Sequence, residues 1–520
     1  KNNNFSFLFF DESEIKAYNS NNDGLILDQK LIKDFFYLDG EKYVFDLKNI
    51  FKKILKEDFY FDKKIDLTKI YDLQLIFWLL NPDKGHYSLK EIISFYSYLN
   101  PIQITQNLIL KLKDLDLEKI YYNLELPLVA ILARMEIKGI KINLDALEEF
   151  KNKVSNENQK LLNEIYNLAG EKFNPNSTVQ LRKILFDKLK LPTKGLSKTN
   201  KGEISTQESE LIKISHTHPI INLILEYRQI NKLLTTYINS LFLNYDPYTK
   251  RIFTNFNQTA TTTGRIVSQN PNLQNLPLEG KMANFLRKCF VSEEGYSFIR
   301  ADYSQIELRL LAHLSKDEAL KAAFENNLDL HLQTAKMIFG EADQEIRRKA
   351  KIINFSIIYG ASAKTLSEKL QIPISEAKKL IEKFFYFYPG VKKLKEDLIE
   401  FTKTYGYVQT LFGRKRFIPE INYQSYREKS FAERIAVNMP IQGLAADIFK
   451  KAMIEIDKEI YQKNLPAFFT LAVHDELVFE VKDEIKEEFA DIIKKKMENV
   501  YSFNVPLIVN LNISNDLSSK

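Results

Sequence analysis

The sequence predicts a multidomain α+β protein. Its 520 residues exceed the roughly 250–300 residues at which a single hydrophobic core stops growing. A content of 45% hydrophobic and 27% charged residues is typical of globular domains that bury a core. Stretches with the two-residue period of strands alternate with stretches that have the 3.6-residue period of helices. We therefore expect several domains, some mixed and some mainly helical.

The first 115 residues combine both periods. Strand-like runs occupy Phe5–Phe10 and Tyr43–Leu47, and helical patterns occupy Asn49–Lys56 and Leu67–Leu80. Alternation of short strands with helices is the pattern of a small α/β domain. We expect such a domain at residues 1–115.

A mainly helical region follows, up to about Tyr237. Apolar residues recur every three or four positions in Leu117–Ile140, Leu144–Ala169 and Leu211–Tyr237. The polar stretch Leu181–Lys201 separates the last two and is rich in lysine. A Lys-rich stretch can simply be a solvated face. Lysines such as Lys194 and Lys198, spread along a tip between two helices, also fit contact with a polyanionic backbone, and the net charge of +6 permits such a partner.

The remainder of the chain returns to mixed structure. Short strands and turns are expected over 251–302, and helices over 305–401. A hairpin is expected at Tyr407–Pro419 with Gly413 in its turn, and a long helix at Ser430–Tyr461. A strand, turn and strand surround Asp475, and a helix and a strand near Val505–Asn510 follow.

Two aspartates follow apolar, strand-like runs far apart in the sequence. Asp302 comes before Ser304–Glu307, which has the spacing of a capping box with Ser304 as N-cap, and by itself Asp302 could be a plain cap. Asp475 lies in a His-Asp-Glu turn, although tight hairpins prefer Asn-Gly or Asp-Gly. Because apolar runs flank this turn, we expect its tip at the floor of a cleft. Two aspartates on adjacent strands could there hold a pair of magnesium ions.

A helix-period row lies between these aspartates in the sequence. Steps of four residues advance about 40° beyond a full turn, so Arg347, Lys351, Phe355 and Tyr359 form one slowly winding stripe. Cations at its start and aromatic rings at its end could bind phosphates and stack on a base. An ordinary amphipathic helix explains a lone stripe better, but two metal-type aspartates favour the ligand-binding interpretation.

Composition excludes several other classes. The single cysteine, Cys289, excludes an internal disulfide and a cysteine-rich zinc site. The longest apolar stretches, such as Leu75–Leu80, are too short to span a bilayer, and no signal peptide pattern opens the chain. The chain begins at Lys1 without a methionine, so we expect a fragment or a processed product.

Three motifs resemble the signatures of family A DNA polymerases. They are Asp302–Arg309 (DYSQIELR), Arg347–Gly360 (RRKAKIINFSIIYG) and Val473–Glu476 (VHDE). From about Leu126 onward the chain is similar to the large, Klenow-type fragment of bacterial DNA polymerase I. The match is incomplete: Ser356 stands where a Gly is usual, Ala472 where a Gln is usual, and Glu279 where an Arg is common.

The resemblance implies a right-hand fold with palm, fingers and thumb beside a degenerate, RNase H-like 3′–5′ exonuclease-like domain. The implied domains are the exonuclease-like domain at 1–115, the thumb with its palm-linking helix at 116–240, a first palm segment at 241–310, the fingers at 311–430 and a second palm segment at 431–520. The carboxylate motifs of a proofreading exonuclease are not found in register at 1–115. Tyr43–Ile50 carries only Asp46, and Asp72 is expected in an apolar helix. We therefore expect no proofreading.

The resemblance also assigns roles. The implied catalytic residues are Asp302, Asp475 and Glu476. The implied ligands of two Mg²⁺ ions, for which Mn²⁺ can substitute, are Asp302, Asp475 and the backbone carbonyl of Tyr303. The implied dNTP-binding residues are Arg347, Lys351, Phe355, Tyr359, His331, Glu307 and Gln305. The implied DNA contacts are Arg265, Arg434, Gln442, Asn438, His474 and the thumb residue Lys232, besides Lys194 and Lys198. Glu307 would close the space near the 2′ position of the sugar, a role compatible with capping.

The expected function is DNA-directed DNA polymerase. The chain would extend a primer 5′ to 3′ on a DNA template from dNTPs, with pyrophosphate release, in DNA repair or replication. It would act as a monomer in the cytoplasm, associated with the nucleoid and with no membrane partner. One alternative is a catalytically silent primer–template binding module of the same fold. Another is a polymerase that prefers an RNA template.

Overall fold

The computed structural model describes residues 5–11, 14–19, 24–26, 29–85, 87–96, 99–199, 201–277, 281–340 and 342–518. Glu279 lies outside them. The chain forms two compact units. Unit 1 comprises Lys1–Gly139, Thr254–Gln274 and Glu293–Ser514, and unit 2 comprises Ile140–Phe253, Asn275–Ser292 and Asn515–Lys520. The five-domain division expected from the sequence is finer than these units and stays a prediction.

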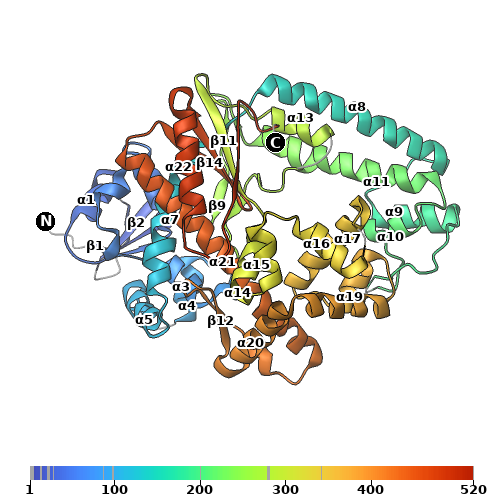
Figure 1. The fold of residues 1–520 in the computed structure, drawn as a ribbon. Coiled ribbons are helices and arrows are strands. Elements are labelled where there is room, and N and C mark those ends of the chain that lie inside the picture. Colours follow the sequence, from blue (N-terminus) through green and yellow to red (C-terminus); the bar gives the residue numbers. More distant parts are fainter. Residues whose placement is uncertain are drawn as a thin grey trace. The chain divides into compact units, whose positions relative to one another are not determined.

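A five-stranded sheet begins unit 1 (Figure 1). Its strands are β1 (Phe5–Asp11), β2 (Glu14–Asn19), β3 (Gly24–Ile26), β4 (Lys42–Phe45) and β5 (Ile70–Asp72), in the order β3-β2-β1-β4-β5. β1 runs parallel to β4, and β4 runs parallel to β5, whereas β2 is antiparallel to β1 and β3. The expected small α/β domain is therefore present.

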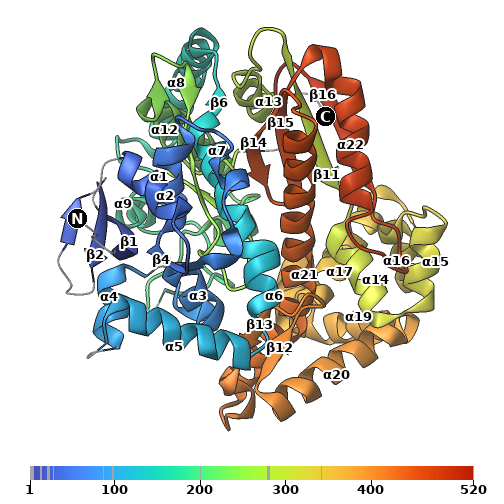
Figure 2. The same ribbon diagram turned by 90° about the vertical axis from the view of Figure 1, so that its left-hand side faces the viewer.

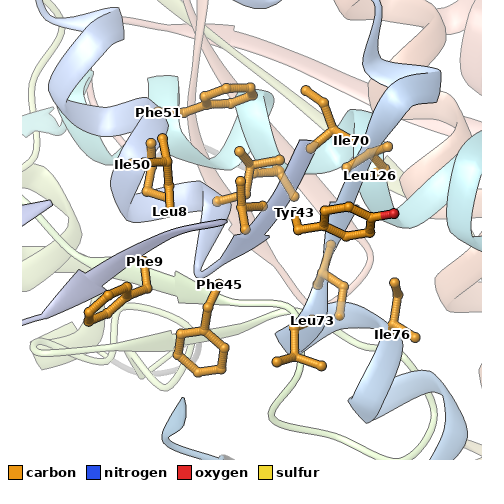
Figure 3. Close-up of a cluster of buried hydrophobic side chains, with 14 of the residues drawn as sticks. Leu8, Phe9, Tyr43, Phe45, Ile50, Phe51, Ile70, Leu73, Ile76 and Leu126 are labelled. Carbon is orange, nitrogen blue, oxygen red and sulfur yellow. The ribbon is translucent and has the colours of Figure 1, made fainter. Parts of the chain in front are cut away.

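Helices cover this sheet. They are α1 (Gln29–Tyr37), α2 (Leu47–Leu55), α3 (Leu73–Leu80), α4 (Leu89–Phe95) and α5 (Pro101–Asp114), with short 3₁₀ turns at Phe61–Lys64, Leu67–Lys69 and Pro82–Lys84. Side chains from β1, β4, α2 and α3 converge in a shared core, with Leu8, Ile50 and Leu73 fully buried (Figure 3). The single helix expected at Leu67–Leu80 is wrong, because Ile70–Asp72 pairs with β4 as a strand before α3 begins.

A four-stranded antiparallel sheet forms the second centre of unit 1. Its strands are β11 (Tyr296–Tyr303), β14 (Ala467–Val473), β15 (Glu476–Lys482) and β16 (Val509–Ser514), in the order β14-β15-β11-β16. The helix α22 (Lys486–Glu498) packs on β11, β15 and β16, and α7 (Leu126–Lys138) packs on β14. A short helix α6 (Glu118–Ile120) and a π-helical turn (Tyr121–Glu125) lead into α7.

The remaining helices of unit 1 lie between β11 and β14 in the sequence. The 37-residue helix α21 (Tyr426–Gln462) contacts α7, α14 and α22 (Figure 2). The other helices are α14 (Ile306–Ser315), α15 (Glu318–Glu325), α16 (Leu330–Phe339), α17 (Gln344–Ile358), α18 (Ala363–Leu370), α19 (Ile374–Phe387) and α20 (Pro389–Tyr405).

The smaller hairpins of unit 1 are β9 (Asn255–Asn257) with β10 (Val267–Gln269) and β12 (Tyr407–Gln409) with β13 (Lys415–Phe417), followed by a 3₁₀ turn at Pro419–Asn422. The expected hairpin at Tyr407–Pro419 is confirmed. Gly413 adopts a φ of +95° in its turn, a conformation that strongly favours glycine.

Unit 2 is mainly helical, as expected. Its long helices α8 (Leu144–Ala169) and α11 (Pro219–Lys232) pack on each other, and α13 (Lys281–Lys288) packs on α8 (Figure 1). The shorter elements are α9 (Thr178–Arg182), α10 (Glu208–Lys213), α12 (Asn239–Leu243), π-helical turns at Lys183–Lys188 and Leu233–Ile238, and a three-stranded sheet of β6 (Ile140–Lys141), β8 (Arg251–Ile252) and β7 (Tyr245–Asp246). The helix expected at Leu211–Tyr237 is interrupted before Pro219, and α13 was not expected.

None of the helices in the described regions of the chain is both long and apolar enough to cross a membrane.

Candidate active site

The two candidate metal ligands lie at one edge of the four-stranded sheet. Asp302 is exposed near the end of β11, opposite Glu476 in the register of β15. Asp475 lies in the two-residue turn between β14 and β15, where His474 has a φ of +53°. The backbone N–H of Tyr303 donates to the backbone carbonyl of Asp475 over 3.2 Å. The fold therefore brings the two motifs together, with Asp475 in the turn as expected.

These residues fit a magnesium ion that a substrate helps to bind. Burial raises the pKa of Asp475, Arg265 opposes this shift, and Glu307 adds to it. In the described residues, no group of three or more acids, histidines and cysteines could hold a metal by itself. Mg²⁺ commonly uses one or two carboxylates together with substrate phosphates. The donor set of Asp302, Asp475 and the Tyr303 carbonyl suits that arrangement.

Glu476, expected among the catalytic residues, is engaged in an ion pair. Arg300 donates to both of its carboxylate oxygens, through Nε to one and through Nη2 to the other over 3.0 Å. Both side chains are largely buried, with 8% and 14% exposed. A carboxylate held in this way is a poor candidate for direct catalysis. The sequence signal for the pair was Arg300 itself, a lone charge within an apolar strand.

The capping box expected at Ser304–Glu307 is wrong. The helix α14 begins after Gln305, whose φ is +51° and whose side chain makes no capping bond. The Glu307 carboxylate instead accepts hydrogen bonds from Arg265 Nη2 and from the Tyr359 hydroxyl, each over 2.6 Å. Burial and then this bond to Glu307 raise the pKa of Tyr359. Three candidate residues from different motifs thus form one network.

The stripe on α17 is confirmed as a helix face. The Phe355 and Tyr359 rings stack with centroids 6.1 Å apart and an interplanar angle of 20°. Lys351 is exposed, and Arg347 donates to the Asp329 carboxylate over 2.7 Å. Asp329, which also caps α16, is a residue that the sequence analysis missed.

His331 lies on α16 beside the aromatic end of this stripe. Its ring centroid is 5.7 Å from that of Phe355, and its Nδ1 is 3.0 Å from the side-chain amide of Asn354. Burial lowers the pKa of His331 to about 4. The ring is therefore neutral near pH 7 and can offer a hydrogen bond but no full positive charge.

Four other candidate DNA contacts lie in unit 1. Arg434, Asn438 and Gln442 follow one another at four-residue spacing along α21, so they share a face. Asn438 donates to the Tyr359 carbonyl over 2.9 Å, which ties this face to the end of α17. Arg434 and His474 are exposed.

The remaining three candidate DNA contacts, Lys194, Lys198 and Lys232, belong to unit 2. All three are exposed, with Lys232 at the end of α11. Neighbouring basic residues are already paired within the unit, since Lys188 binds Glu171 and Arg182 binds Glu203. The basic stretch is thus only partly engaged inside the protein.

In the N-terminal sheet, the side chains of Asp72 and Asp46 accept hydrogen bonds from nearby backbone N–H groups. Asp72 is buried at the end of β5, rather than within a helix as expected, and accepts hydrogen bonds from the N–H groups of Leu47 and Gln74 over 3.0 and 2.9 Å. Asp46 caps α2 by accepting from Asn49. Burial raises the pKa of Asp72 to about 7.

Comparisons with known proteins agree with this geometry. The family model for DNA polymerase family A matches residues 144–519, well over half of the chain. DNA polymerase I of Caldicellulosiruptor bescii is 40% identical over 500 residues, which are 92% of this chain and 58% of that protein. The thermostable DNA polymerase I of Thermus thermophilus is 44% identical over 407 residues, 77% of this chain and 48% of that protein.

A solved structure is similar over nearly the whole chain. The POL domain of Pol1 from M. smegmatis, in complex with DNA primer-template and dNTP, has a TM-score of 0.89 at 30% identity, and the match covers 97% of this chain and 92% of that one. This chain spans about half the length of the curated relatives it matches.

Proposed function

The chain belongs to DNA polymerase family A, and we propose that it is a DNA-directed DNA polymerase that extends a primer 5′ to 3′. The observation that carries the proposal is the network in which Glu307 accepts hydrogen bonds from both Arg265 and Tyr359. This network includes Tyr359, at the end of the stripe, and its members Arg265 and Glu307 both influence the pKa of Asp475. A divalent-cation site, a phosphate-binding face and a stacking surface would thereby form one centre.

The residues would divide the reaction among them. The 3′-oxygen of the primer would attack the α-phosphorus of a dNTP, and the bond from that phosphorus to the bridging oxygen would break to release pyrophosphate. Arg347 and Lys351 would bind the phosphates, with neutral His331 as a hydrogen-bond donor. Phe355 and Tyr359 would support the incoming nucleotide and the templating base. Asp302, Asp475 and the Tyr303 carbonyl would hold two Mg²⁺ or Mn²⁺ ions. When bound, these ions would make the 3′-hydroxyl of the primer more acidic and would stabilise the negative charge of the leaving pyrophosphate.

The DNA contacts complete the proposal. Arg265, Arg434, Gln442, Asn438 and His474 would line the primer–template near this centre, and Gln305 would lie beside the nucleotide. The exposed lysines Lys194, Lys198 and Lys232 would contact the DNA backbone. We assign to Glu307 the exclusion of ribonucleotides that the family resemblance implies. Its carboxylate is bonded to Arg265 and Tyr359 and does not cap the helix.

We also propose that the chain lacks proofreading and acts as a monomer. Support for the first point comes from Asp46 and Asp72, whose oxygens hold backbone or neighbouring side chains in the N-terminal sheet. A protein that acts on genomic DNA would lie in the cytoplasm at the nucleoid, so that placement depends on the proposed substrate.

The test is extension of a 5′-labelled primer with Mg²⁺, with and without dNTPs, on matched DNA and RNA templates. We expect elongation on DNA with dNTPs and an unchanged primer without them. Binding without elongation would instead establish the silent binding module. Preferential elongation on RNA would make the chain an RNA-templated enzyme, and a shortened primer would reveal a proofreading activity.

A further inference from the structure

The turn that carries Arg265 is held closed at its base. The Thr261 hydroxyl donates to the Arg265 carbonyl over 2.9 Å, which joins the two ends of the turn. Arg265 Nε is buried and has no hydrogen-bond partner among the described residues. Together with the bond from Nη2 to Glu307, this leaves Arg265 with an unused donor. The side chain as a whole is 34% exposed, so the position of the turn decides how the exposed part of the guanidinium is presented.

Arg414 packs against one side of this turn. A Cβ atom on Gly264, whose φ is +84°, would lie 2.7 Å from Arg414 Cζ, so the guanidinium rests directly on the glycine. The neighbouring Arg416 donates through Nη1 to the Thr262 hydroxyl over 3.0 Å. Two arginines of the β12–β13 hairpin thus contact neighbouring positions of the turn.

A buried network of charges fixes Arg414. Its Nε donates to Asp447 over 2.7 Å, and its Nη2 donates to Glu125. Lys450 binds both oxygens of Glu125 over 2.7 and 2.9 Å. Two acids and two bases balance in charge, as buried charges require. Lys450 and Asp475 line the same small cavity, so this network reaches the candidate active site.

A residue of the N-terminal α/β domain, Trp78, also contacts the turn. Trp78 on α3 is 2% exposed and is the single tryptophan of the chain. Its indole Nε1–H donates to the Thr261 carbonyl over 3.2 Å. Arg414 Cζ and Lys450 Nζ each lie 5.3 Å from the centre of its ring, within cation–π range. Trp78 thus joins the turn to the buried charges.

We propose that Trp78 is a positioning residue for Arg265, so that the N-terminal domain is a working component of the primer-binding centre. This inference rests on the proposed function, because it gives Arg265 the primer–template as its ligand. The indole holds the base of the turn, and Arg414 holds its middle. Arg265 is thereby held in a fixed position for DNA, which lowers the cost of binding.

The test uses Trp78→Phe, which keeps an aromatic ring and removes the donor to Thr261. We expect the KM for primer–template to rise about threefold to tenfold, the range for one lost hydrogen bond, with kcat nearly unchanged. Phe77→Leu is the matched control, because Phe77 is buried one residue earlier and packs on Tyr87 and Phe95 instead of the turn. It should lower the melting temperature without raising KM.

A double mutant separates positioning from mere support of the fold. In an Arg265→Ala background, Trp78→Phe should raise the KM no further, because its effect passes through Arg265. Additive effects, or an equal rise in KM with Phe77→Leu, would overturn the proposal. If Trp78→Phe does not fold, benzothienylalanine can replace the single tryptophan and exchange its N–H for sulfur in nearly the same shape, with the same expectations.

A direct readout needs no catalysis. One tryptophan gives one indole N–H resonance in the ¹⁵N-labelled protein, and its proton should exchange slowly because it is bonded to Thr261. Adding primer–template should shift this resonance in the wild type and not in Arg265→Ala. If the wild type shifts but extends no primer, the proposed catalytic function fails while positioning stands. If it extends primers without a shift, the positioning fails.

Discussion

The two sheets of unit 1 both carry aspartates at strand ends and use them in opposite ways. In the N-terminal sheet, Asp72 is buried and accepts two backbone hydrogen bonds, and Asp46 caps the next helix. In the four-stranded sheet, Asp302 is exposed and Asp475 lies in the turn between β14 and β15. An acid after a strand is therefore ambiguous by itself. What distinguishes Asp72 from Asp302 is burial, because Asp72 is 1% exposed whereas Asp302 lies at the surface.

The largest expected difference is in catalysis. Asp475→Ala should reduce primer extension by about a thousandfold or more, because a lost metal ligand removes several kcal/mol of transition-state stabilisation. Asp46→Ala is the matched change in the other sheet and should leave extension within about twofold, at a loss of about 1 kcal/mol of stability for the cap. Single-turnover extension, with DNA binding followed by anisotropy, measures both. Extension by Asp475→Ala at the wild-type rate would remove the functional side of the comparison.

The next largest effect concerns Glu476, the acid of the four-stranded sheet that is paired with Arg300. Arg300→Met should lower the free energy of unfolding by about 3 kcal/mol, because it leaves the largely buried Glu476 without its bidentate partner. Arg300→Met combined with Glu476→Gln should recover most of that loss. Urea denaturation of the wild type, both single variants and the double variant measures this. Purely additive losses would mean that the two side chains act independently.

For folding stability, in contrast to catalysis, removal of an aspartate should cost more in the N-terminal sheet than in the four-stranded sheet. Asp72→Ala should cost about 2 kcal/mol, because the buried N–H groups of Leu47 and Gln74 lose their acceptor. Asp302→Ala, at an exposed position, should change stability by less than about 0.5 kcal/mol. Trp78 lies in the helix that Asp72 caps, so its fluorescence can follow denaturation. Equal losses for the two variants would show that burial does not separate these acids.

The smallest expected effects are on the pH dependence of stability, to which Asp72 and His331 contribute in opposite directions. Burial raises the pKa of Asp72 from 3.8 to about 7, so its contribution to stability is present at low pH and is lost as the pH rises through 7. Burial lowers the pKa of His331 from 6.5 to about 4, so its contribution is present above pH 6.5 and is lost as the pH falls. Lowering the pH from 7 to 5.5 should cost about 1 kcal/mol through His331.

Two variants separate these responses. Asp72→Asn should make stability rise more steeply with pH between 5.5 and 7, whereas His331→Asn should flatten or reverse the rise. Denaturation of each protein at both pH values measures the slopes. A change of slope in the same direction for both variants would contradict these assignments.

Local features of the site could be predicted from the sequence. The stripe depends only on the helical period: Arg347, Lys351 and Phe355 lie on α17, and Tyr359 is its C-cap. The turn at His474 and Asp475 depends on two neighbouring strands, and it too is present. Two predictions from local patterns were wrong because residues distant in the sequence interact with the same segment. Ser304–Glu307 has capping-box spacing, yet Arg265 and Tyr359 bind Glu307. Ile70–Asp72 has a helical pattern, yet it pairs with β4.

The sequence by itself determined the α+β class, the motifs of family A and the helical and hairpin segments that display them, because periodicity and turn chemistry act over a few residues. Only the tertiary structure decided which charges are already engaged: Glu476 by Arg300, Arg347 by Asp329, and Glu307 by Arg265 and Tyr359. It also decided that Trp78 of the N-terminal domain supports the turn that carries Arg265. These pairings join residues that are distant in sequence, so they depend on how whole elements pack, which no local pattern encodes.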